Sequence, residues 1–353
     1  MSAVGRGSAD PERRPLPFKH NSAHRHRIPR AQCRVRNWPQ YDAGLRRRGD
    51  LTLWLDEAAL VGWQAPRRTT PGGQARYSDL AIELVLMLRL VFHLALRQAE
   101  GFVGSVLRFL GLELGVPDHT TLSRRSRGLA GRRPRVVPHG PLHLLIDSTG
   151  LKLFGQGEWQ EAKHGRARRS WRKLHLAFDA DTGEIAASIL TGNHADDAAQ
   201  VPNLLDQIEG EIASVTADGA YDGEPVYQAA ERRQPGQPPT VIIPPRSSAV
   251  LGAQADAPPS QRDCHIQLIR DKGRLHAASL HVPPGDRFAM AWQKATGYGR
   301  RSLAETGIGR YKALIGPRLR ARTLPAQQGE VALAAEVLNR MIRTAKPVSV
   351  RVA

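Results

Sequence analysis

The sequence of 353 residues lacks the short motifs that mark several large enzyme classes. It contains no Walker phosphate loop, no Gly-x-Gly-x-x-Gly, no Cys-x-x-Cys, no His-Glu-x-x-His and no Gly-x-Ser-x-Gly. These absences argue against nucleotide hydrolysis, hydride transfer and serine-type hydrolysis. Only two cysteines are present, Cys33 and Cys264, and such a lone pair favours inert thiols over a redox or metal site.

Long apolar runs are missing as well. The N-terminal segment has no apolar stretch after its basic start, so it does not read as a secretory signal. The most apolar stretch, Leu80 to Leu96, contains Glu83, Arg89 and His93, whereas a membrane span needs about 20 residues largely free of charge. We therefore expect a cytoplasmic protein with no membrane partner.

Acidic residues are scarce relative to basic ones. The chain has 51 Lys and Arg against 33 Asp and Glu, which gives a formal net charge of +18. Such an excess is expected of a protein whose partner is rich in phosphates, and nucleic acid is the leading candidate. An acidic membrane surface is the competing interpretation, but no basic amphipathic helix stands beside an apolar anchor.

Composition and periodicity divide the chain into three parts. Residues 1–50 are rich in arginine, histidine and proline and have no helical or strand period, which predicts a basic arm that is disordered until it meets an anion. Residues 51–131 have a helical pattern, and a stretch rich in proline and arginine follows them. From residue 141 to 346, strand and helix patterns mix, which predicts an α/β (α+β) fold with a central mixed sheet.

The helical part has the outline of a helix-turn-helix. A long apolar helix is followed by a break at Gly101, a second helix over roughly residues 100–112, and a short third helix that Asp118 caps. That third helix carries Arg124 and Arg125, so it could enter the major groove of DNA. A solvated basic helix face is the alternative interpretation.

Two apolar runs of the third part each end in an aspartate. Asp147 follows such a run in LLIDSTG and Asp218 follows one in VTADGAYD, so both are expected at the ends of buried strands. Further along, residues 263–282 suggest a hairpin. The bland alternative is that the two aspartates merely cap strand ends.

A helical row lies near the C-terminus and falls within an arc of about 60° on one helix. The row consists of Tyr298, Arg301, Glu305 and Lys312. Because two glycines weaken the helix one turn after Glu305, the direction of Lys312 is less secure than that of the others. Glu305 could also simply pair with Arg301 one turn back.

The three carboxylates together suggest phosphoryl chemistry. Oxygen ligands from Asp147, Asp218 and Glu305 would suit Mg²⁺, and two such cations can activate the attacking oxygen and stabilise the leaving one. Arg301 could hold a phosphate with its fork, and Lys312 could bind one as a point charge. Tyr298 could stack on a base or a sugar.

On these residues the chain resembles the DDE transposases of bacterial insertion sequences, in the IS-five and IS-four groups. Their third carboxylate lies in a signature of Tyr, two residues, Arg, three residues, Glu, six residues and Lys, which the C-terminal row matches at every spacing. Their second motif, Asp-Gly-Ala-Tyr, is matched from Asp218 to Tyr221, and their first by Asp147 in IDST. The resemblance extends over roughly residues 34–345.

The resemblance implies a fold, an activity and its partners. It implies an RNase H-like catalytic core, with flanking helices around the mixed sheet, in which Asp147, Asp218 and Glu305 bind two Mg²⁺ ions, with Mn²⁺ as a substitute. Its DNA partners would be the terminal inverted repeats of the mobile element and the target, which are hydrolysed and joined by strand transfer. Since two ends are cut together, at least a dimer is expected in the active complex, associated with the bacterial nucleoid.

A basic run between the first two predicted strands offers a phosphate track beside the site. Its members are Lys163, His164, Arg166, Arg168, Arg169, Arg172 and Lys173. A solvated basic loop is the alternative. Two other functions stay open beside the transposase: a catalytically silent DNA-binding repressor or relic, and a stand-alone RNase H-like nuclease that cuts without joining.

Overall fold

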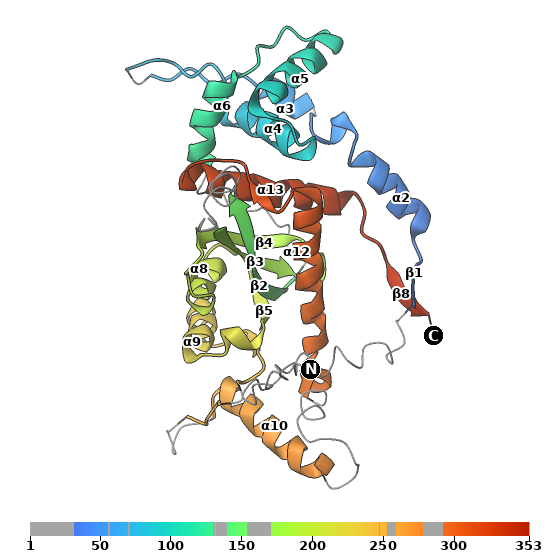
Figure 1. Cartoon of the computed structure of the whole chain (residues 1–353), viewed down its shortest axis with the longest axis vertical. Coiled ribbons are helices and arrows are strands. Elements are labelled where there is room, and N and C mark those ends of the chain that lie inside the picture. Colours follow the sequence, from blue (N-terminus) through green and yellow to red (C-terminus); the bar gives the residue numbers. More distant parts are fainter. Residues whose placement is uncertain are drawn as a thin grey trace, which may run out of the picture. The chain divides into compact units, whose positions relative to one another are not determined.

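The computed structural model describes most of the chain beyond the N-terminal segment (Figure 1). The described residues are 32–55, 57–69, 71–129, 131, 140–153, 171–246, 248–252, 259–277 and 292–352. They fall into two compact units, one formed by the segments up to Leu45 and from Ala345 onward and the other by Arg46–Thr344. Each unit is described by itself below.

The smaller unit is built on a two-stranded ribbon. Strand β1 (Gln32–Val35) pairs antiparallel with β8 (Ser349–Val352). The Asn37 side chain supports this pairing, because its amide donates to the carbonyl of Lys346 and its oxygen accepts from the backbone N–H of Val348. Helix α2 (Trp38–Arg47) begins directly afterwards. Residues 32–47, which the sequence assigned to an arm without a period, therefore form a strand and a helix.

The larger unit begins with a helical part, in which α4 and α5 are the two long helices. Its helices are η2 (Leu51–Leu53), α3 (Glu57–Val61), α4 (Asp79–Val91), α5 (Leu96–Phe109), α6 (His119–Arg125) and η3 (Ser126–Leu129). The break between the two long helices differs from the predicted one. It lies at His93, whose φ of 54° ends α4, and α5 restarts where the Gln98 side chain accepts from the backbone N–H of Ala95. Gly101 lies inside α5, so the predicted break there is wrong.

The mixed sheet contains β2 (Leu142–Leu153), β3 (Trp171–Asp179), β4 (Ile185–Gly192), β5 (Ile212–Thr216) and β6 (Thr240–Ile242), with the short β7 (Arg318–Leu319) beside β2. Its order is β4-β3-β2-β5-β6, with β3 antiparallel to both of its neighbours and β2, β5 and β6 parallel. This is the arrangement of an RNase H-like core, and it confirms the predicted fold class.

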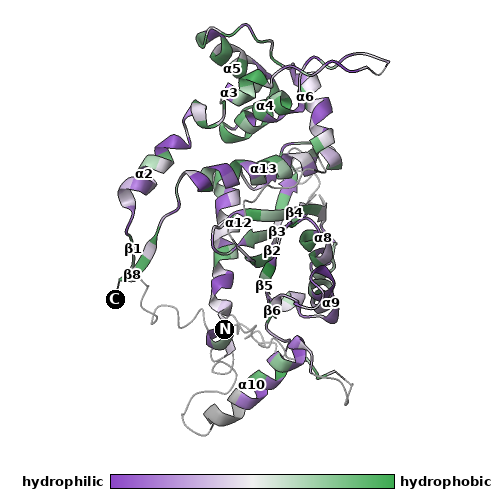
Figure 2. Cartoon of the chain, turned by 180° about the vertical axis from the view of Figure 1, so that it is seen from behind, coloured by the Kyte–Doolittle hydropathy of each residue, from purple (hydrophilic) through white to green (hydrophobic). Residues whose placement is uncertain are grey.

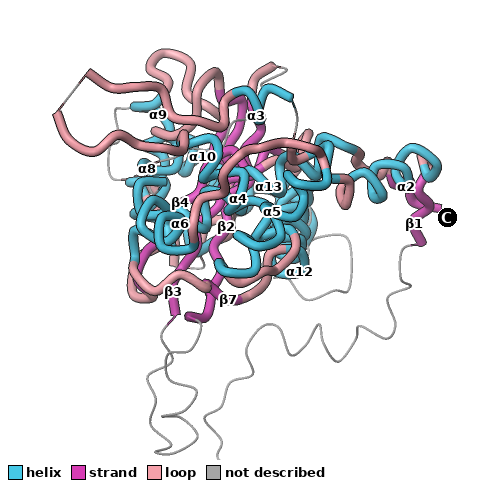
Figure 3. Tube along the Cα trace, turned by 90° about the horizontal axis from the view of Figure 1, so that it is seen from above, coloured by secondary structure: helices cyan, strands magenta, loops and turns pink. Residues whose placement is uncertain are grey.

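The remaining helices are η4 (Ala198–Gln200), α8 (Val201–Leu205), η5 (Gly219–Tyr221), α9 (Glu224–Arg233), α10 (Gln261–Ala277), η6 (Tyr298–Arg301), α12 (Ser302–Leu314) and α13 (Leu324–Thr344). Helices α8 and α9 cover one face of the sheet, and α12 and α13 cover the other (Figures 1 and 3). The hairpin predicted for residues 263–282 is wrong, since residues 261–277 form α10.

The side chains of strand β2 alternate between the two faces of the sheet. Leu144 and Ile146 belong to the core under α8 and α9, whereas Leu145 and Leu151 belong to the core under α12 and α13. This alternation is the period of two expected for a strand that is covered on both faces. Asp147, two residues after Leu145, is therefore directed toward the α12 face.

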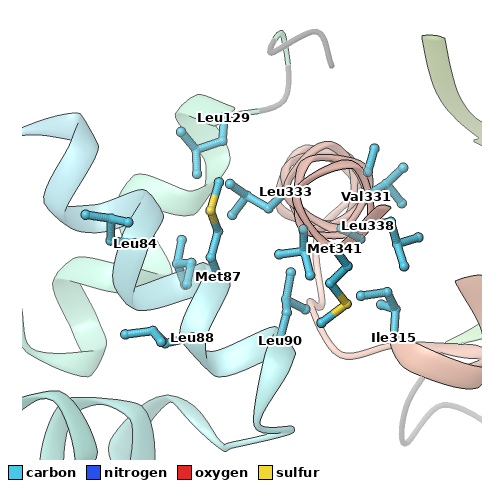
Figure 4. Close-up of a cluster of buried hydrophobic side chains, with 14 of the residues drawn as sticks. Leu84, Met87, Leu88, Leu90, Leu129, Ile315, Val331, Leu333, Leu338 and Met341 are labelled. Atoms are coloured by element: carbon cyan, nitrogen blue, oxygen red, sulfur yellow. The ribbon is translucent and has the colours of Figure 1, made fainter. Parts of the chain in front are cut away.

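The helices from η2 to η3 and the sheet share the core that lies under α12 and α13. Helix α4, which is strongly hydrophobic in Figure 2, directs Met87 and Leu90 toward α13, and Leu333 of α13 lies beside Met87 (Figure 4). In the described part of the chain, no helix is both long enough and apolar enough to cross a membrane.

Two glycines allow helices to approach closely. A Cβ atom at Gly307 would lie 2.5 Å from the ring of Phe178, so only glycine lets α12 lie this close to β3. A Cβ atom at Gly329 would collide with the backbone oxygen of Ser126, which brings α13 against η3. Helix α12 continues through Gly307 and Gly309, so the two glycines do not interrupt it after Glu305.

Candidate active site

The first acidic residue, Asp147, lies in the middle of β2 rather than at a strand end. It faces Leu176 of β3, while on the other side β2 pairs with β5 only as far as Leu145 and with β7 only from Lys152. The sheet is thus open beside Asp147. Its carboxylate accepts a hydrogen bond from the backbone N–H of Ser148 at 2.8 Å and its side chain is 14 % exposed.

Asp218 lies beside Asp147 because of the register between the parallel strands β2 and β5. Leu145 pairs with Thr216, so Asp147 and Asp218 each lie two residues beyond a paired position. The Asp218 carboxylate accepts from the backbone N–H of Ala220 at 2.8 Å, which starts η5. The predicted proximity of the two aspartates follows from this register.

Glu305 comes from the first turn of α12, on the face of the sheet toward which Asp147 is directed. One guanidinium connects all three acids. Arg301 Nη1 lies 2.8 Å from Glu305 Oε1, and Arg301 Nη2 lies 3.3 Å from Asp147 Oδ2 and 3.5 Å from Asp218 Oδ2. Residues from three separate elements therefore meet around a single positive charge.

The charges in this cluster influence one another. Burial raises the pKa of Asp147, the Ser148 N–H and Arg301 lower it, and the charges of Asp218 and Glu305 raise it further, with a net upward shift. Burial alone would lower the pKa of Arg301, but the surrounding carboxylates, Asp147 foremost, raise it above its ordinary value. Arg301 thus stays charged. Its single positive charge cannot balance the combined negative charge of the three carboxylates.

Tyr298 and Arg301 lie in the 3₁₀ turn η6 rather than on α12 itself, which begins at Ser302. The row expected on one α-helix is therefore split at this point. The Tyr298 ring lies 5.2 Å from the ring of Trp292, and burial raises the pKa of its hydroxyl, with the acids of the site nearby. Lys312 lies two helical turns beyond Glu305 on an unbroken α12, so these two share a face.

A buried aromatic pair, which sequence reasoning missed, anchors the turn that carries Tyr298. Trp292 Nε1 donates to His265 Nδ1 at 3.0 Å, and His265 Nε2 lies 2.7 Å from the carbonyl oxygen of Val241 in β6. An indole nitrogen can only donate, so Nδ1 is unprotonated and Nε2 carries the proton that binds Val241. Burial, opposed by the hydrogen bond to Val241, lowers the pKa of His265 and favours this neutral form. Three distant segments are joined here, which no local motif could indicate.

A second buried network was also missed. His175 of β3 is fully buried, with Nδ1 3.2 Å from Asp197, which also pairs with Lys173 at 3.1 Å. Nearby, the Tyr221 hydroxyl is buried and has no hydrogen-bond partner among the described residues. Burial, and then the charges of Asp197, Asp147 and Asp218, raise the pKa of Tyr221, so its hydroxyl keeps its proton. The sequence signal for this network was limited to the Asp-Gly-Ala-Tyr motif.

The predicted DNA-binding residues divide by their surroundings. Arg172 donates to Gln327 at 3.1 Å and Lys173 pairs with Asp197, so both already have protein partners. Arg125 binds the carbonyl of Tyr77 and the carboxylate of Asp79, whereas Arg124 is exposed. The rest of the predicted basic track lies outside the described residues: Lys163, His164, Arg166, Arg168 and Arg169. Their contact with DNA stays a prediction.

Among the residues that the structure describes, no three His, Cys, Asp or Glu side chains are arranged closely enough to hold a metal ion. The carboxylates of Asp147, Asp218 and Glu305 instead surround the Arg301 guanidinium. The donor set consists of hard oxygen atoms, and it already holds a positive charge in its midst, so its chemistry fits Mg²⁺.

An RNase H-like sheet that gathers two aspartates and a helix-borne glutamate defines the class of DDE proteins. A family model described as "Transposase DDE domain" matches residues 138–340, more than half of the chain, and a second model of the same description matches residues 46–156. The chain belongs to the DDE transposases.

Two solved structures are similar over most of the chain. One is the "Cryo-EM structure of piggyBac transposase synaptic complex with hairpin DNA", at 11 % identity and a TM-score of 0.36, covering 85 % of this chain and 75 % of that one. The other is the "Drosophila P element transposase strand transfer complex", at 9 % identity and a TM-score of 0.29, covering 92 % and 85 %. The assignment to the family depends on the family models.

Proposed function

We propose that this transposase binds the ends of an insertion sequence, hydrolyses phosphodiester bonds there and joins the freed ends to target DNA. The observation that supports this most is that all three acids of the family signature, Asp147, Asp218 and Glu305, contact the same Arg301 guanidinium. A strand-end cap or a simple helix ion pair would not require all three to meet.

Asp147, Asp218 and Glu305 are the residues that would hold divalent cations, Mg²⁺ or its substitute Mn²⁺. Bound there, two such ions would activate the attacking oxygen and stabilise the leaving oxygen of a displacement at phosphorus.

Arg301 has two roles in this proposal. Without substrate it offsets part of the negative charge of the acids. With substrate, its fork can turn to the phosphate whose bond is broken, since a guanidinium binds phosphate oxygens in pairs. Lys312 would bind a neighbouring phosphate, and Tyr298, fixed from behind by Trp292, would stack on a base or sugar. Each of these residues binds or orients the DNA.

A reaction of purified protein with labelled element-end DNA tests the proposal. Wild type is compared with Glu305→Gln, and with Glu231→Gln as a matched change of an exposed glutamate on α9, while cleavage and joining are scored separately. We expect Mg²⁺-dependent cleavage and joining in wild type and Glu231→Gln, and neither in Glu305→Gln.

The other outcomes identify the alternatives. Cleavage without joining would indicate a stand-alone nuclease. End binding without chemistry that depends on Glu305 would indicate a repressor or relic. Chromatography of the protein with and without end DNA tests the expected dimer in the active complex, since a complex with one chain per pair of ends would contradict it.

A further inference from the structure

A cavity of about 1120 Å³ lies in the larger unit, outside the carboxylate site, and arginines line it. They come from α4, α5, α6, η3 and the segment that joins β7 to α13. The six are Arg89, Arg97, Arg124, Arg127, Arg320 and Arg322. None of the described residues that line this cavity is acidic. Its charge is thus opposite to that of the site around Asp147.

Two of the arginines form a fixed inner wall. Arg320 Nη1 donates to the carbonyl of Leu94 at 3.1 Å, and Arg89 is largely buried with its Nε unpaired in the described structure. Burial lowers the pKa of Arg89, while the nearby Glu330 raises it and Arg320 lowers it. Glu330 is the acid beside this wall, and its oxygens already accept the backbone N–H groups of Arg320 and Ala321.

The other four arginines form an exposed rim. Arg124 has one weak contact, at 3.4 Å to the hydroxyl of Thr121, and Arg97, Arg127 and Arg322 have no salt bridge within the described residues. Gathering like charges without counter-ions is unfavourable, and a bound polyanion removes that cost. Guanidinium groups suit phosphate oxygens in particular, since they offer paired donors.

The neighbouring Arg125, in contrast to the rim arginines, has an ion-pair partner. It lies on the same short helix as Arg124, but its guanidinium binds Asp79 and the carbonyl of Tyr77 and so ties α6 to the start of α4. From the sequence alone, Arg124 and Arg125 are expected to have the same role. The structure separates them into one arginine that is free for a ligand and one that stabilises the helical segment.

We propose that this cavity binds backbone phosphates of DNA, as a second contact site distinct from the one that cuts. The inference rests on the proposed function, in that DNA is the substrate. The segment carrying Arg320 and Arg322 continues from β7, which pairs with the end of β2 at Leu153. Since β2 also carries Asp147, phosphates held in the cavity would be kept in a fixed relation to the carboxylate site.

Salt-dependent binding of duplex DNA, measured by fluorescence anisotropy, tests the cavity. The double variant Arg124→Gln with Arg322→Gln removes two rim charges, one from α6 and one from the segment that joins β7 to α13. The control, Arg67→Gln with Arg232→Gln, removes two exposed arginines elsewhere and changes the net charge equally. If each rim arginine neutralises a phosphate, the slope of log K against log salt becomes shallower by about 2 in the cavity variant. We expect the control to keep the wild-type slope.

Several results would overturn the inference. Equal slopes in the cavity variant and the control would mean that the general basic surface, and not the cavity, binds DNA. Stronger retention by anionic lipid vesicles than by DNA would assign the arginines to a membrane. A matching Tm for wild type, the cavity variant and the control shows that the two double variants are folded. Arg125→Gln, in contrast, is expected to lower Tm and leave the slope unchanged.

The two proposals can fail separately. If wild type binds no DNA and cuts none, the proposed function fails. If wild type cuts DNA in a manner that depends on Glu305 while the cavity variant keeps the full salt slope, only the cavity assignment fails.

Discussion

The acidic residues of the active site differ in how they are held. Asp147 lies in β2 and Asp218 directly follows the neighbouring parallel strand β5. Each accepts a backbone N–H, and their side chains are 14 % and 36 % exposed. Glu305 comes from the start of a helix, is 65 % exposed and has Arg301 as its ion-pair partner in the described structure. The sheet therefore provides two fixed carboxylates, and the helix provides one that can adjust.

This difference means that the position of Glu305 depends on the supports of α12. Gly307 determines how closely the helix lies on β3, and Trp292 fixes the turn that precedes it. Both supports lie outside the set of acids, yet both affect where the third carboxylate is placed. The following predictions test the contrast between the fixed pair and the adjustable acid.

The largest expected effect comes from changing side-chain length at a fixed acid. Asp147→Glu pushes a carboxylate into a rigid, half-buried strand position, so we expect DNA cleavage to fall by about 100-fold or more. Glu305→Asp shortens an exposed side chain on a helix, and we expect only about a tenfold loss. Single-turnover cleavage rates measure both, and equal losses would break the comparison.

The next effect concerns the approach of α12 to the sheet. Gly307→Ala places a methyl group 2.5 Å from Phe178, so we expect a loss of about 1 to 3 kcal/mol in the free energy of unfolding and a reduced cleavage rate. Gly309→Ala is the matched control on the same helix. It meets no atom within 4 Å, and alanine favours helix, so it should stabilise by up to about 1 kcal/mol. Urea unfolding measures the free energy of unfolding of both variants. An unchanged value for Gly307→Ala would contradict the close packing of α12 on β3.

A smaller loss is expected at the turn before Glu305. Trp292→Phe keeps the ring but removes the N–H that binds His265, which should cost about 1 kcal/mol. Trp38→Phe, at an exposed tryptophan, provides the control and should leave the stability unchanged. Thermal unfolding measures both. If cleavage by Trp292→Phe were unaffected despite the lower stability, the turn would not position Tyr298.

The smallest effect is a gain in stability. Folding raises the pKa of Asp147, chiefly by burial, so its ionised form is disfavoured in the native state. This penalty is present at pH 7 and disappears as the pH falls below the ordinary value of about 3.9. Asp147→Asn should therefore be more stable than wild type by up to about 1 kcal/mol at pH 7, with the advantage shrinking toward pH 4. Glu231→Gln should show no such gain; a constant difference at all pH values would exclude the electrostatic cause.

Much of the fold followed from local sequence patterns, because strand alternation and motif spacing are local properties. The run before Asp147 and the run before Asp218 predicted two strands, and their meeting followed from parallel pairing. Residues 148–153 also have a strand pattern, and β2 does run to Leu153. The expectation that Asp147 ends a strand was wrong, because these less apolar residues extend β2 by pairing with β3 and β7.

Tertiary contacts explain the main errors. The apolar pattern from Asp79 onward continues across His93, so no local pattern indicates that the chain turns there. In α10 the residues alternate like a strand, but Gln261 and His265 bind the backbone of Val241 in β6, and these contacts favour the helix. The role of Arg301 as the link among three acids also required distances that spacing cannot supply.

The ribbon of β1 and β8 has a consequence for the order of folding. Its paired residues, such as Gln32 and Val352, are separated by nearly the whole chain, so closing the ribbon costs much chain entropy. Two strands by themselves are only marginally stable in water. We therefore expect the ribbon to form late during folding and to open early on heating, so that amide hydrogens of β1 and β8 exchange well before those of β2 and β3.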